Sequence, residues 1–243
     1  MCSRITGLPS RDGSVILGLT ADEQQTVLLT LRVAGLAVAF ALPLALVTAI
    51  VLARGRFPGR FLLNAAVHLP LMLPPVVTGW LLLLVFGSQG LAGSWLLRHL
   101  HFRLVFTEAG AALACGVMVF PHMVRAIRLS VEAVDPHLEQ AARTLGAHFL
   151  NRFATITVPL AMPGLLTAGV LGYTASLGEF GAVITFAANI PGHTRTLPLA
   201  IYSALESPGG EAQAARLALM SVGLAVAGLL LAEVLGKRRK TSF

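Results

Sequence analysis

Long apolar stretches, here called blocks, alternate with short polar segments along most of the chain. Five blocks cover about residues 27–52, 62–86, 109–131, 159–188 and 212–235. Each is long enough to provide the ~20 helical residues that cross the hydrocarbon layer of a membrane. A backbone in lipid must pair its own polar groups, and the blocks lack the period-two alternation of membrane-spanning strands. The pattern therefore predicts an all-α membrane protein with five transmembrane helices.

Prolines interrupt four of the five blocks, and Pro74 and Pro75 stand side by side in the second. Proline removes a helical hydrogen bond, and in a membrane the neighbouring helices satisfy the carbonyl that is left over. Two interpretations stay open. The prolines either produce ordinary curvature of the bundle, or they bend a helix that lines a pore.

The composition supports membrane spans over a large soluble core. The chain is 56% hydrophobic and 12% charged, whereas a soluble domain is about 25% charged. The formal net charge is +7, but the basic residues lie in short segments between blocks and not in a continuous stripe. This placement follows the positive-inside rule, so no nucleic-acid partner is expected.

The positions of lysine and arginine predict the orientation. They follow the first block, flank the third and end the chain, which places these segments in the cytoplasm and the N-terminus outside. The residues are Arg54, Arg56, Arg60, Arg125, Arg128, Arg143, Arg152, Lys237, Arg238, Arg239 and Lys240.

Three regions are expected along the chain. Residues 1–21 form an N-terminal tail with the composition of a disordered segment and no apolar core of a signal peptide. Residues 22–236 form the transmembrane domain, and residues 237–243 form a basic cytoplasmic tail that also suits contact with anionic lipid.

The longest cytoplasmic segment predicts a short amphipathic helix. Asp135 is a good N-cap, Pro136 suits the first helical position, and Gly146 ends or bends the helix. Its apolar stripe consists of Leu138, Ala142, Leu145 and Phe149. From the residues alone, this helix either lies on the membrane surface or inserts into a groove on a partner protein.

The same segment resembles a known motif. Glu139-Gln140-Ala141-Ala142, then Gly146, then Ile156-Thr157-Val158-Pro159 resembles the EAA motif of ABC-importer permeases. The resemblance implies a coupling helix that docks on an ATP-binding subunit. The coupling residues would be Glu139, Ala141, Ala142, Gly146 and Pro159.

Four further stretches, 68–77, 123–129, 176–182 and 189–199, resemble the permeases of molybdate transporters. His122 and His193 depart from that pattern. The resemblance implies a type I ABC importer permease in the bacterial inner membrane. Two cytoplasmic ATP-binding subunits and a periplasmic molybdate-binding protein would be its partners. Five transmembrane helices are too few to enclose a transport path, so a homodimer with the path on its two-fold axis is expected.

The chain is not expected to be an enzyme or to hold a cofactor. It has no GxxxxGK[ST] phosphate loop, so ATP hydrolysis would belong to another subunit. His99 and His101 lack an evident third ligand, so no metal site is expected. For His68 and His122, which lie in blocks, packing in the core is favoured over a proton relay.

Glu179 is the one acidic residue deep in the fourth block. Gly178 and Gly181 flank it and permit either close helix packing or a local hinge. A carboxyl at membrane depth either is bonded inside the bundle or lies at a gate of the path. Ser176 is a candidate for the anion path, as are Thr174 and Thr185, although such hydroxyls often bond their own helix backbone.

Two alternative functions stay open at this point. One is a permease for a related oxyanion, either tungstate or sulfate and thiosulfate. The other is a self-sufficient channel or secondary transporter. The sequence shows no internal repeat and no paired broken helices in two halves, which argues against the second alternative.

Overall fold

The computed structural model describes residues 20–240; residues 1–19 and 241–243 are outside the described part. The expected N-terminal tail is therefore almost wholly outside it. The described part consists of helices and the segments that connect them, and it contains no β-strand. Its elements, in chain order, are α1 (Ala21–Arg54), α2 (Arg60–Met72), α3 (Pro75–Phe86), α4 (Leu91–Leu100), α5 (Glu108–Glu132), α6 (Pro136–Thr144), α7 (Phe149–Arg152), the π-helix η1 (Phe153–Thr157), α8 (Val158–Leu177), α9 (Gly181–Phe186), α10 (Leu197–Glu206) and α11 (Glu211–Lys240).

Four helices are long and apolar enough to cross a membrane. They are α1, α5, α8 and α11, and the pair α2–α3 is a fifth span if its two parts count as one. The predicted all-α membrane fold is therefore confirmed. The last helix runs to Lys240, so the backbone of 237–240 continues α11.

The second block is broken and not merely kinked. The helix direction bends by 118° between α2 and α3. Leu73 and Pro74 between them are extended, with ψ of 145° and 136°. A residue before proline avoids the helical region, and two successive prolines impose this on two successive residues. The sequence predicted the position of this bend but not its extent.

The fourth block is also broken, which corrects the expected place of Glu179. α8 ends at Leu177, and α9 begins only at Gly181. Glu179 therefore lies in a break between two helices and not deep inside one continuous span. The absence of paired broken helices, inferred from the sequence, is wrong for these two blocks.

The helices of the core approach closely because small residues lie between them. The buried face of α1 is a stripe of alanines, namely Ala34, Ala37, Ala41, Ala45 and Ala49. On α8, a side chain at Gly164 would meet Ser130 Cβ at 2.3 Å, and one at Gly172 would meet Met123 Sδ at 2.9 Å, both on α5. Small residues at such contacts are typical of helices that pack within a membrane.

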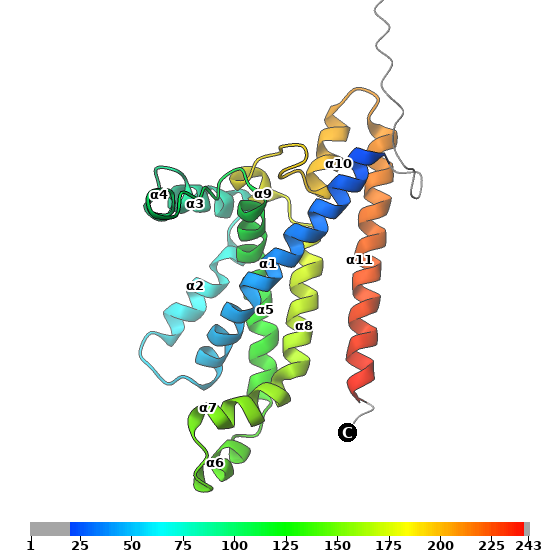
Figure 1. Cartoon of the computed structure of the whole chain (residues 1–243). Helices are drawn as coiled ribbons and strands as arrows, with labels where there is room; N and C mark the ends of the chain where they lie inside the picture. Colours follow the sequence, from blue (N-terminus) through cyan, green and yellow to red (C-terminus); the bar gives the residue numbers. More distant parts are fainter. Residues whose placement is uncertain (1–19, 241–243) are drawn as a thin grey trace, which may run out of the picture.

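The helices are arranged so that the two unusual regions lie at opposite ends of the molecule. α1, α5 and α8 run through the middle, and α2 and α11 flank them on opposite sides (Figure 1). α6 and α7 lie at one end of the bundle, whereas α3, α4, α9 and α10 gather at the other (Figure 1). The short helices α4 and α10 fill segments that the sequence left as loops.

Candidate functional site

The short helix α6 begins and ends as its sequence predicts. The Asp135 carboxylate accepts a hydrogen bond from the His137 backbone N–H at 2.9 Å, and Pro136 is the first helical residue. Gly146 has a φ of +82°, a conformation that favours glycine. Its N–H donates to the Arg143 carbonyl at 3.0 Å. The helix therefore stops at a defined point, which is typical of a glycine-terminated helix.

The apolar stripe of α6 is open to its surroundings. The exposed fraction is 48% for Leu138 and 87% for Leu145. Ala141 and Gly146 are also exposed, and nothing lies within 4 Å of the position that a Gly146 side chain would take. The side chain of Glu139 is outside the described part. Together these residues leave an apolar surface with room for another backbone at the end of the bundle.

Arg54 ties the base of α6 to the core, a role that the sequence did not reveal. It is the last residue of α1, and its Nη2 donates to the carbonyls of Val131 at 3.2 Å and Val134 at 2.9 Å. Val134 immediately precedes the Asp135 cap of α6. From the sequence, Arg54 indicated only the orientation in the membrane. No local sequence pattern predicts a contact with a segment 77–80 residues away.

The far side of α6 is joined to α8 through two short elements. α6 contacts α7 and η1, and η1 continues directly into α8. Pro159 is exposed near the start of α8, and Thr157 before it is buried. α6 is therefore linked to the end of α1 through Arg54 on one side and to α8 through α7 and η1 on the other.

The two broken spans meet each other at the opposite end of the bundle. A side chain at Gly181 of α9 would meet Pro75 Cβ at 2.7 Å, and one at Gly79 of α3 would meet the Ala182 carbonyl at 2.8 Å. The two glycines permit backbone contact between α3 and α9. The breaks at 73–74 and 178–180 thus form one junction, here called the broken-helix junction.

Glu179 has a structural contact within this junction. Its Oε1 accepts a hydrogen bond from the Ala182 backbone N–H at 3.0 Å, which satisfies one of the free donors at the start of α9. The side chain is half-buried, Gly178 beside it is exposed, and Gly181 is half-buried.

The three candidate hydroxyls all bond their own helices. Ser176 is buried and donates to the Gly172 carbonyl at 2.7 Å. Thr174 donates to the Val170 carbonyl at 2.9 Å, and Thr185 donates to Gly181 at 2.8 Å. The arrangement is the local backbone bonding that such residues favour in membrane helices.

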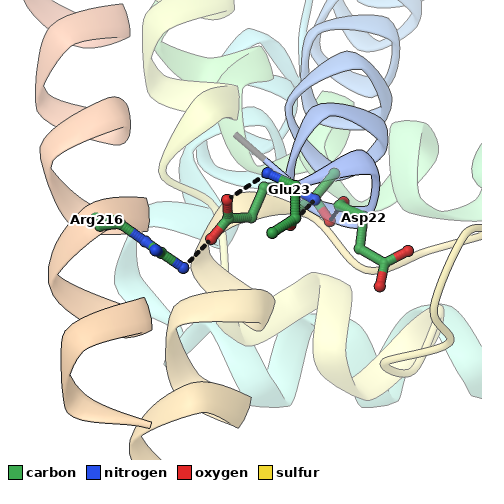
Figure 2. A network of polar contacts seen from close by, with 5 residues as sticks. Asp22, Glu23 and Arg216 are labelled. Carbon is green, nitrogen blue, oxygen red and sulfur yellow. Dashed lines mark hydrogen bonds and ion pairs between the residues drawn. The ribbon is translucent and has the colours of Figure 1, made fainter. Parts of the chain in front are cut away.

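A polar contact joins α1 and α11 (Figure 2) at the end of the bundle opposite α6 (Figure 1). Glu23 is 2% exposed; it accepts from the Thr20 N–H at 3.0 Å and from Arg216 Nη2 of α11 at 2.9 Å. Asp22 beside it points away from this contact (Figure 2). The sequence Thr-x-x-Glu was a detectable capping signal, whereas no pattern indicated Arg216.

The histidines form no metal site in the described residues, where no group of three suitable ligands is found. His122 is exposed on α5, so its expected packing in the core is wrong. His68 contacts the Asn64 carbonyl at 2.8 Å, and Asn64 Oδ1 accepts from Arg128 of α5 at 3.1 Å. His68 therefore bonds within α2, and the hydrogen bond from Arg128 to Asn64 joins α2 to α5.

Solved structures identify the class of fold. The structure of a bacterial ABC transporter that imports the acidic polysaccharide alginate matches with a TM-score of 0.73 at 18% identity, over 91% of this chain and 81% of that chain. The structure of an amino acid ABC transporter matches with a TM-score of 0.62 at 18% identity, over 89% and 94%. The fold is that of the permeases of type I ABC importers.

Sequence comparison identifies the family. Residues 41–241 match the binding-protein-dependent transport system inner membrane component model, and the chain belongs to this family. It is 52% identical over 219 residues to the molybdenum transport system permease protein ModB of Escherichia coli K12, which covers 90% of this chain and 96% of that protein. ModB of Haemophilus influenzae is 50% identical over 210 residues, with coverage of 86% and 92%.

The sulfate transport system permease protein CysT of Escherichia coli K12 is more distant, at 38% identity over 189 residues, with coverage of 78% and 67%. The chain is therefore a multi-pass inner-membrane transport component of an ABC importer and not an enzyme.

Proposed function

We propose that this chain is the membrane permease of an ATP-driven importer that brings molybdate across the inner membrane. The observation that carries the proposal is the 52% identity to ModB over nearly the whole of both chains. An importer permease needs a passage for its cargo and a docking surface for its ATPase. The broken-helix junction is the candidate for the passage, and α6 is the candidate for the docking surface.

The docking surface in this proposal is the exposed face of α6. Glu139, Ala141, Ala142 and Gly146 would contact the ATP-binding subunit, and Pro159 would set the start of the helix that responds. The support is physical: α6 has an open apolar stripe and defined ends. It is also joined to the core on both sides.

The proposed assembly is a homodimer with two cytoplasmic ATP-binding subunits and one periplasmic molybdate-binding protein. The path follows the two-fold axis, and the N-terminus lies outside with the C-terminus in the cytoplasm. The distribution of basic residues supports this orientation. Residues 22–236 form the permease domain, residues 1–21 precede it, and residues 237–243 form its basic tail.

Transport would proceed by alternating access. Closure of the ATPase dimer moves α6, and the contacts of Arg54 and η1 carry the motion to α1 and α8. The junction of α3 with α9 then opens or closes, and Gly178, Glu179 and Gly181 act at this gate beside Ser176. A carboxylate repels an anion, so Glu179 holds the gate and does not bind the cargo.

A permease for sulfate is the second candidate, because CysT is 38% identical over 189 residues. Tungstate and thiosulfate belong to the same group of oxyanions. Specificity for the anion is expected to reside in the binding protein. The permease then needs only a passage of low affinity.

The test is uptake of radioactive molybdate by vesicles that contain the permease, its ATPase and its binding protein. Unlabelled tungstate and sulfate are added as competitors. We expect uptake that excess sulfate leaves unchanged. Uptake of labelled sulfate in place of molybdate would overturn the assignment of cargo.

A further inference from the structure

An apolar groove of about 800 Å³ lies between α1, α2 and α5. Every residue that lines it is apolar. Its inner surface is made of small residues such as Ala112 and Gly116, and Phe40 and Phe120 provide aromatic walls. The volume is within the ~300–1,000 Å³ of typical ligand sites. The groove is suited to an alkyl chain and offers a polar ligand no partner.

One end of the groove is formed by α4 and the loop after it. Leu96, Phe102 and Leu104 line it there, at the end of the bundle opposite α6 (Figure 1). Between and beside them is an exposed set of basic residues, here called the basic rim, which consists of Arg98, His99, His101 and Arg103. Residues 87–107 contain no aspartate or glutamate, and the first carboxylate after them is Glu108 at the start of α5.

α4 has the features of a helix that lies in the headgroup layer of a membrane. It has ten residues, which is too short to span. Leu91 is 92% exposed and Trp95 is 56% exposed. Arg98 and His99 occupy its last turn, and the ring of His99 is 5.2 Å from that of Trp95. Exposed Trp beside Arg on a short amphipathic helix is typical of the membrane–water boundary.

We propose that this groove binds an anionic phospholipid, with one acyl chain in the groove and the phosphate against Arg98 and Arg103 of the basic rim. Charge complementarity selects this occupant. A helix of a second copy would fill the apolar part but would leave the rim without a counter-charge. A phospholipid with an anionic headgroup satisfies both parts at once.

The bound chain has a structural effect on the broken span. It fills the space between α1 and α2 and braces the first half of that span against the core. The site is separate from α6 and from the broken-helix junction, and the proposal does not depend on which anion is transported.

The test uses the full-length chain in vesicles that contain a phosphatidylglycerol with a photoreactive acyl chain, or the matching phosphatidylcholine. Labelled peptides are mapped by mass spectrometry. We expect phosphatidylglycerol to label the groove segments of α1, α2 and α5 more strongly than phosphatidylcholine. The variant Arg98→Gln/Arg103→Gln should reduce this preference by about fivefold for each arginine removed.

A second variant keeps the test independent of the arginines. Ala65 and Ala66 are neighbouring exposed alanines of α2, but only Ala66 lines the groove. Ala66→Trp should abolish the labelling, whereas the matched Ala65→Trp should leave it unchanged. The control for charge is Arg56→Gln/Arg125→Gln, which removes two exposed arginines elsewhere and should have no effect.

Three results would overturn the proposal. They are equal labelling by the two lipids, labelling that survives Ala66→Trp, and disulfide cross-linking of two copies through an Ala66→Cys/Cys2→Ser variant in native membranes. The last result would assign the groove to the contact between subunits.

Discussion

Gly146 is the residue whose conformation bears most directly on ATPase docking. Its φ of +82° favours glycine, and its surroundings are open. We expect Gly146→Asp to weaken docking of the ATP-binding subunit by about tenfold, or about 1.4 kcal/mol, and to lower ATPase stimulation accordingly. The reason is that a charged side chain prevents close approach of the partner. The measurement is stimulated ATP hydrolysis by the assembled complex.

The control for backbone strain is Gly209→Asp. Gly209 has a φ of +76° and equally open surroundings, but it lies between α10 and α11 at the other end of the bundle. That variant should keep normal docking. Full stimulation of the Gly146→Asp complex would remove α6 from the docking surface.

Glu179 has two possible contributions, and two substitutions separate them. Its carboxyl caps α9 through the Ala182 N–H, and it is the acidic group at the proposed gate. Glu179→Ala should impair uptake and cost about 1 kcal/mol of helix stability, as the loss of a cap does. Glu179→Gln retains an acceptor oxygen for the cap and removes only the charge.

The outcome is read from uptake by vesicles with each variant. If the glutamine variant transports as poorly as the alanine variant, the charge acts at the gate. Normal transport by both variants would exclude Glu179 from the gate.

At the scale of elements, Arg54 fixes the end of α1 against the turn that begins α6. Arg54→Met removes two hydrogen bonds from a charged donor, and we expect a loss of about 2 kcal/mol in stability. ATPase stimulation should fall as well, because α6 loses one of its two connections to the core. Arg56→Met is the matched control in the same segment, since Arg56 is exposed. Unchanged stimulation in Arg54→Met would show that this contact does not transmit the motion.

The contact between Glu23 and Arg216 holds α11 to the start of α1. Arg216 is 54% exposed and Glu23 is 2% exposed. Arg216→Met leaves a buried carboxylate without its cation, so we expect a loss of about 1–3 kcal/mol and a lower thermal midpoint. Exposed Arg125→Met should have little effect. In the double variant with Glu23→Gln the losses should not add, because the two residues share one interaction; additive losses would count against the pair.

At the scale of the whole molecule, the sequence predicted what local patterns determine. The apolar blocks correspond to the long helices and the bent pair, and Asp135 and Gly146 bound α6 as expected. The sequence left the break in the fourth block undecided, because Gly178 and Gly181 suit either a hinge or ordinary close packing. The contacts of Arg54 and Arg216 were missed because each joins residues far apart in the chain.

Whether a candidate site could be predicted from the sequence also depended on whether its residues lie close together in the chain. The coupling motif was found because it is continuous in sequence and its spacing is specific. The junction of α3 with α9 was not found, because it requires two breaks from separate blocks to come together in space.

The central claim is that this permease transports only when an ATPase drives it through α6. The most direct measurement is uptake of radioactive molybdate into vesicles with the binding protein present, with and without the ATP-binding subunit. We expect uptake that requires both ATP and that subunit, and that Gly146→Asp lowers by about tenfold. Uptake that persists without the ATP-binding subunit would contradict the account.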